Sequence, residues 1–136
     1  MATQSTSIFD YSFKAENDLS AKQYYLLEIS GTSGADVLVD VCDAATDRVV
    51  GVLMNEPAAN QGASTRILGI APVVSDGSGT PITVGAYVGP NTSGKAVVKA
   101  TADYSVCGIA LDASSADGTV IRVLLLPGAF FRTAAG

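Results

Sequence analysis

A chain of 136 residues with 48% hydrophobic residues is long enough to bury the core of one domain but too short for two. Its formal net charge is −5 and its eight basic residues are scattered singly, which excludes the clustered Lys/Arg surface that nucleic-acid binding requires. Only 15% of the residues are charged, against about 25% in typical soluble domains, which indicates that other subunits cover part of the surface.

The N-terminal segment has the alternation of a strand. Phe9, Tyr11 and Phe13 alternate with polar residues, and a period of two with aromatic residues is typical of strands. Two interpretations stay open: an arm that adds as a strand to another chain, or an edge strand of the chain's own sheet. No basic and apolar leader precedes this segment, and no apolar run has the length of a membrane span. We therefore expect a soluble protein made in a cytoplasm.

The rest of the chain consists of short β-branched segments separated by turns rich in Gly, Pro, Asn and Asp. A polar stretch at 17–23 is expected to form a turn or one short helical turn. This pattern predicts an all-β fold, a small sandwich or partly open barrel of short antiparallel strands with an extended N-terminal arm. The predicted strands are residues 24–30, 37–43, 48–54, 64–74, 82–89, 95–102, 105–111 and 119–126. The predicted organisation is an arm at 1–16, a single β-domain at 17–127 and a C-terminal tail at 128–136.

Two stretches of the sequence repeat one pattern. VVGVLMNEPAANQGASTRILG and SVCGIALDASSADGTVIRVLL each contain a strand with an internal glycine, an Asn or Asp, an Ala-rich loop, a second glycine and a strand with one arginine. The loop glycines accommodate tight turns because they lack a Cβ. The repetition indicates two pseudo-equivalent hairpins of one domain, and chance similarity between short hairpins is the alternative.

Arg66 and Arg122 occupy equivalent places in these two hairpins. Each is a lone charge in an apolar strand, and a solvent-facing strand residue is the simplest interpretation. The functional alternative is an anchor at a subunit interface, because arginine is enriched at the hot spots of protein contacts.

The octapeptide GPNTSGKA at residues 89–96 resembles a phosphate-binding loop but lacks its essential parts. Position 96 is Ala instead of the Ser or Thr that binds Mg²⁺. The following KAVVKATA alternates like a strand, whereas the motif needs a helix N-terminus. We therefore interpret this stretch as a hairpin turn.

The residue types needed for most enzyme mechanisms are missing. The absence of histidine removes Ser-His-Asp and Cys-His catalysis and the usual nitrogen ligands of zinc. The carboxylates Asp36, Asp40, Asp43 and Asp47 lie close in sequence but do not follow the EF-hand pattern, and nothing selects a catalytic pair. We expect no enzyme activity, no catalytic residue, no cofactor and no metal.

Cys42 and Cys107 lie far apart in the sequence, each within an apolar run. Buried, inert thiols are the simplest interpretation. A disulfide between the two stays open.

Three stretches together resemble a known family. DRVVGVLMNEPAANQGASTRILGIAPV looks like the small capsid cement or head-decoration proteins of tailed bacteriophages, in which Gly-Val-x-x-Asn-x-Pro-Ala-Ala precedes a strand ending in Gly-x-Ala/Val. PITVGAYVGPNTSGKAV is similar to a later hairpin of that family, and GIALDASSADGTVIRVLL resembles its closing segment. The resemblance runs from about Asp18 to Leu126. Cys107, the terminal PGAFFRTAAG and the aromatic arm depart from the pattern, which leaves the capsid-facing surface open.

The resemblance implies a structural virion protein on the outer surface of the phage head, synthesised in the host cytoplasm. Such a protein would clamp neighbouring major capsid subunits, as a homotrimer, without nucleic-acid or membrane partners. The candidate capsid contacts are Phe9, Tyr11 and Phe13, and the candidate subunit contacts are Arg66 and Arg122. The alternative is a host- or glycan-binding module displayed on the virion.

Overall fold

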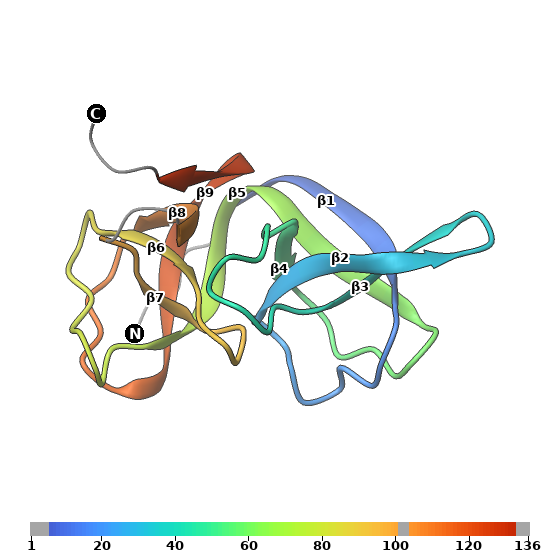
Figure 1. Ribbon diagram of the computed structural model, residues 1–136, viewed down its shortest axis with the longest axis horizontal. Coiled ribbons are helices and arrows are strands. Elements are labelled where there is room, and N and C mark those ends of the chain that lie inside the picture. Colours follow the sequence, from blue (N-terminus) through green and yellow to red (C-terminus); the bar gives the residue numbers. More distant parts are fainter. Residues whose placement is uncertain (1–5, 101–103, 133–136) are drawn as a thin grey trace.

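The computed structural model describes residues 6–100 and 104–132 and contains nine strands and no helix within these ranges (Figure 1). The all-β prediction is confirmed. Eight of the observed strands overlap the eight predicted segments, and the first strand overlaps the N-terminal segment that has the alternation of a strand. The strands are β1 (Thr6–Ala15), β2 (Leu26–Ser33), β3 (Asp36–Val41), β4 (Gly51–Leu53), β5 (Gly62–Asp76), β6 (Tyr87–Pro90), β7 (Ala96–Val98), β8 (Tyr104–Ala110) and β9 (Asp117–Arg132).

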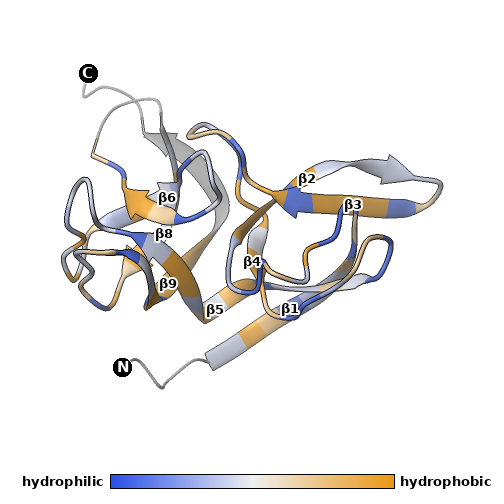
Figure 2. Ribbon diagram, turned by 90° about the horizontal axis from the view of Figure 1, so that it is seen from below, coloured by the Kyte–Doolittle hydropathy of each residue, from blue (hydrophilic) through white to orange (hydrophobic). Residues whose placement is uncertain are grey.

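The strands form one sheet that curls into two ring-like lobes joined by β5. In the first lobe, pairing runs from β1 through β3, β2, β4 and β5, and β5 pairs again with β1. In the second lobe, β5 pairs with β7, and pairing continues through β6, β8 and β9 back to β5. Figures 1 and 2 show both lobes from two directions, with the β2–β3 hairpin projecting at one end. The sheet is ring-like without closing into a barrel.

Two hydrophobic clusters fill the lobes, and β2 and β4 separate them. Successive side chains of a strand point to opposite faces. Leu26 and Val52 accordingly belong to the larger cluster, whereas Leu27 and Leu53 belong to the smaller one. Both faces of these strands are therefore buried, which explains why their sequences read as continuous apolar runs.

The two repeated stretches are antiparallel hairpins, β4–β5 and β8–β9, and the aligned glycines and the aligned Asn55 and Asp112 make contacts of the same kind with partners that are not themselves aligned. A Cβ added at Gly51 would meet the Arg66 carbonyl oxygen, and one added at Gly108 would meet the Leu124 carbonyl oxygen. The Asn55 side chain accepts a hydrogen bond from the Ser64 amide across its hairpin, as Asp112 does from the Arg122 amide. The two hairpins thus share a close strand contact and a side-chain clamp.

The structure also tests the expectations for residues 89–96, for the two cysteines and for membrane-spanning helices. Residues 91–95 form the turn of the antiparallel hairpin β6–β7. There the Asn91 side chain accepts hydrogen bonds from the amides of Ser93 and Lys95, so the hairpin interpretation is confirmed. Cys42 and Cys107 are buried free thiols, and burial raises the pKa of both. Among the described residues, no helix has the length and hydropathy needed to cross a membrane.

Candidate functional site

β1 carries the three aromatic residues along one side of the strand. The Phe9 and Tyr11 ring centroids are 6.4 Å apart, and those of Tyr11 and Phe13 are 4.8 Å apart in an edge-on arrangement. Phe13 packs against the smaller core cluster, whereas Phe9 and Tyr11 are 49% and 52% exposed. The three predicted contact residues thus form a continuous aromatic stripe that is anchored at one end and open to solvent at the other.

The segment predicted as an arm pairs with the chain's own sheet. β1 lies antiparallel to β5 from Thr6↔Ile70 to Lys14↔Gly62, with irregularities near Phe9. The edge-strand interpretation therefore describes the isolated chain. Addition of a strand from another molecule stays a prediction, because it concerns the other edge of β1.

Arg66 holds β1 to β5. Its Nε donates to Asp10 Oδ1 at 3.1 Å and its Nη1 donates to the Ile70 carbonyl at 3.1 Å. Only 11% of the Arg66 side chain is exposed, so the solvent-facing interpretation does not hold here. Burial alone would raise the pKa of Asp10, but hydrogen bonds from Arg66 and Ser7 and the Arg66 charge outweigh it and lower that pKa.

Arg122 makes the corresponding ion pair in the second hairpin. Its Nε and Nη2 donate to the two carboxylate oxygens of Asp112 at 3.0 and 2.9 Å, a two-pronged geometry that strengthens such pairs. About a quarter of each side chain is exposed, 28% for Arg122 and 26% for Asp112. The structure therefore engages both predicted arginines within the chain, with Arg122 the more accessible.

An exposed apolar row crosses the second lobe beside Arg122. Tyr87 pairs with Ile109, Ile109 with Leu124 and Leu124 with Ile70, which places the four side chains on one face. Tyr87 is 44% and Leu124 38% exposed, and the two isoleucines are half-buried. The sequence alone does not reveal this row, because it depends on the register between strands that are distant in the chain.

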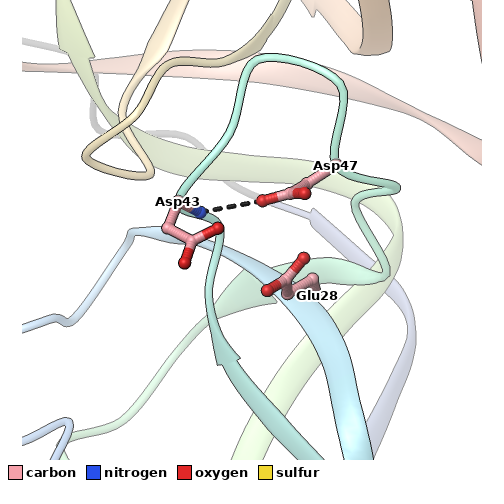
Figure 3. Close-up of side chains that lie close together, drawn as sticks. All are labelled: Glu28, Asp43 and Asp47. Atoms are coloured by element: carbon pink, nitrogen blue, oxygen red, sulfur yellow. Dashed lines mark hydrogen bonds between the residues drawn. The ribbon is translucent and has the colours of Figure 1, made fainter.

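Three carboxylates converge where β2 meets the loop between β3 and β4. Glu28, Asp43 and Asp47 place one oxygen each within 4.8 Å of the others (Figure 3). Asp43 and Asp47 lie near other aspartates in the sequence, but only the fold brings Glu28 to them. These oxygens are close enough to share one cation, although exposed acidic groups commonly have such spacing without one.

The surroundings of Glu28 make its carboxyl group a weaker acid than that of a free glutamate side chain. Burial, the charge of Asp47 and a hydrogen bond with it, and the charges of Asp43 and Asp40 together raise the pKa of Glu28 to about 7. Asp47 also orders the loop, because its carboxylate accepts hydrogen bonds from the amides of Asp43 and Ala44. Ionisation of Glu28 therefore acts against this loop conformation.

We expect Glu28→Gln to stabilise the chain increasingly above about pH 4.5, with the full gain reached above about pH 7. A carboxyl group whose pKa rises on folding contributes stability that is complete below its unfolded value of about 4.5 and is lost as the pH rises through about 7. At pH 8 the variant should exceed the wild type by roughly 1 kcal/mol, a value discounted for solvent screening, and at pH 4 the two should coincide. Urea unfolding at both pH values measures this difference, and Glu56→Gln in the exposed β4–β5 loop is the control. Parallel pH profiles of Glu28→Gln and wild type would contradict it.

Comparisons with known proteins gave a matching family and a similar solved structure. A family model described as "Phage cement protein" matches residues 3–125. Among solved structures, the chain is similar to the N base of the head fiber gp8.5 of bacteriophage phi29, with a TM-score of 0.67 and 18% sequence identity. That likeness covers 87% of this chain and 93% of the phi29 chain, and at this identity it shows the fold. No curated protein matches.

Proposed function

Because the chain belongs to the phage cement protein family, a family of structural capsid proteins and not of enzymes, we propose that it binds the outer surface of the assembled head. It clamps neighbouring major capsid subunits there and stabilises the shell. The observation that carries the proposal is the aromatic stripe of Phe9, Tyr11 and Phe13 on β1, whose first two rings are about half exposed.

The stripe suits a protein contact for physical reasons. Aromatic side chains supply large apolar areas and are enriched among the residues that dominate binding energies. Phe13 packs against the core and stacks edge-on with Tyr11, so little side-chain freedom remains to be lost when Tyr11 meets a partner. Burial of such an exposed aromatic surface against a partner is therefore favourable, because it removes apolar area from water at a small cost in side-chain entropy.

A homotrimer would multiply this contact. Three linked binding sites raise the overall affinity without any single large interface. Each site needs to bury only about 800 Å² per partner to be specific. Binding to the assembled lattice but not to free subunits stabilises the shell by about 2.7 kcal/mol at a hundredfold excess over the dissociation constant.

The subunit contact of the trimer is proposed on the exposed row of Tyr87, Ile109, Leu124 and Ile70, with Arg122 at its border. Arg122 precedes Leu124 by two residues on β9 and therefore shares its face. Arg66 is more enclosed within its own chain and would act on such a contact by holding β1 in place.

The location follows from the proposed contacts. The protein would be synthesised in the host cytoplasm and would join the outside of the head, where its net charge of −5 disfavours adsorption to nucleic acid.

Replacing both exposed aromatic residues should disrupt head binding. We expect Phe9→Ser/Tyr11→Ser to weaken binding to heads assembled without this chain at least tenfold, because exposed aromatic anchors contribute on the order of 2 kcal/mol or more. Co-sedimentation with such heads measures the affinity. Val84→Ser removes a 66% exposed side chain on the other lobe and is the matched control.

Light scattering after gel filtration tests the trimer separately, through a mass near three times 13.8 kDa.

If Phe9→Ser/Tyr11→Ser binds heads with wild-type affinity, the role of the aromatic stripe is refuted. Binding to host cells but not to heads would favour a displayed host- or glycan-binding module.

A further inference from the structure

β1 has one edge that the described part of the chain leaves largely unpaired. Its partner on that side is β3, which lies parallel to it only at Lys14↔Leu38 and Ala15↔Val39. Towards their N-terminal ends the two strands separate, because β1 follows β5 while β3 stays with β2 in the projecting hairpin. A wedge-shaped gap therefore opens between two strands of one sheet.

Backbone hydrogen bonds show which peptide groups face this gap. The Ala15 amide donates to the Gln61 carbonyl and the Ala15 carbonyl accepts from the Asn60 amide, so the peptide groups of Ala15 point towards β5. Peptide groups alternate along a strand, and those of Ser12 consequently point away from β5, into the gap.

The same reasoning applies to the opposite wall. The Val39 carbonyl accepts a hydrogen bond from the Glu16 amide of the β1 side. Two residues earlier, the peptide groups of Val37 therefore point towards β1 as well. Backbone donors and acceptors of both walls are therefore directed into the gap.

A groove of about 380 Å³ adjoins this gap and extends across β1 towards the start of β5. It is lined by residues 11–14 of β1, residues 35–37 of the hairpin, Asn60 and Gly62. The Lys14 Nζ and Asp36 Oδ2 atoms are 3.4 Å apart, with 30% and 60% of the side chains exposed. Such an exposed ion pair is weak and opens readily, while its charges protect the free edge from self-association.

We infer that this groove accepts an extended segment of the capsid subunit as an added strand between β1 and β3. An extended backbone satisfies the peptide groups of both walls at once and continues the sheet. Tyr11 and Phe13 line the groove and belong to the stripe proposed to face the capsid, which favours the capsid as the source of the strand. The inference rests on the proposed function and specifies its mode of recognition.

Proline substitutions test the role of the backbone separately from that of the side chains. Ser12→Pro removes an amide that faces the groove and leaves the pairing with β5 in place, as edge strands permit. Val37→Pro does the same on the other wall. We expect each proline variant to bind heads assembled without this chain at least tenfold more weakly. Ser12→Ala and Val37→Ala keep the amide and should bind within about twofold of the wild type.

The outcomes separate the two proposals. If wild-type protein does not bind heads, the proposed function fails. If Phe9→Ser/Tyr11→Ser loses binding while Ser12→Pro, with an unchanged urea midpoint, binds normally, the function stands and strand addition is refuted. Equal losses in the proline and alanine variants would also refute it, since the side chains would then account for the effect.

Amide hydrogen exchange of the wild type provides a readout if a proline variant does not fold. Peptides covering residues 11–13 and 36–38 should exchange at least tenfold more slowly on heads than in solution. Unchanged exchange on saturated heads would refute the inference. Slow exchange of these peptides in the free protein that disappears on dilution would refute it as well, because a second copy of the chain would then fill the groove.

Discussion

Alanine at Gly51 or Gly108 is expected to destabilise the fold by about 3 kcal/mol, the upper end of the usual cost of overpacking. An added Cβ at Gly51 would lie 2.5 Å from the Arg66 carbonyl oxygen and 2.6 Å from Thr65 Cγ2. At Gly108 it would meet the Leu124 carbonyl oxygen. Backbone atoms of a paired strand cannot move aside as a flexible side chain can, so the hairpin itself must distort. Urea unfolding of each variant measures the loss.

Gly31→Ala is the control for this effect. Gly31 is also a strand glycine, yet nothing lies within 4 Å of a Cβ added there, so the substitution should change the free energy of unfolding by less than about 1 kcal/mol. Equal losses at Gly31 and Gly51 would show that strand glycines matter for backbone flexibility and not for close packing.

Removal of the Asp10 carboxylate is expected to cost roughly 2 kcal/mol at neutral pH. Asp10→Ala leaves the enclosed Arg66 guanidinium without its counter-charge, and an uncompensated buried charge is more costly than the loss of an exposed pair. The loss should be greatest at neutral pH. Because the pKa of Asp10 is lowered in the folded chain, its contribution is present above the ordinary carboxyl range and disappears as the pH falls through the folded value.

Unfolding free energies at pH 7 and pH 3 measure this contribution, and Asp36→Ala is the matched control. Asp36 also pairs with a cation on β1, but 60% of its side chain is exposed, so its removal should cost less than about 1 kcal/mol. The double variant Asp10→Ala/Arg66→Met should recover part of the loss. If the double variant is as unstable as the sum of its single changes, Arg66 does not depend on Asp10.

The positions of the strands were predictable because they depend on local chemistry. Alternating apolar residues and turn residues marked every strand, and Asn91 with Gly94 marked the β6–β7 turn. Two boundaries were wrong: β6 begins at Tyr87 instead of residue 82, and β9 continues to Arg132 instead of ending at residue 126. In short strands too, the boundaries were less accurate: among the described residues of the predicted segment 95–102, only Ala96–Val98 form a strand. Periodicity alone does not give such a boundary, because packing against a neighbouring strand decides where pairing stops.

The closure of each lobe was not predictable, because it depends on pairings between distant segments. β1 and β5 are joined by contacts such as Asp10 with Arg66, which lie 56 residues apart. The two arginines illustrate the result. Their equivalence was visible in the sequence, but Arg122 finds its carboxylate within its own hairpin, whereas Arg66 finds one on β1. Glu28 likewise joins Asp43 and Asp47 only through the register of β2 and β3.

The strand shared by the two lobes makes them unequal as separate pieces. A chain divided after β5, in the turn near Gly79, would leave β5 with the N-terminal fragment, which would then hold every strand of its own ring. The C-terminal fragment would lack the strand that β7 and β9 both require. The second lobe therefore needs β5, a strand that the first lobe also contains. Because both lobes pair with this strand, loss of β5 should unfold the two together.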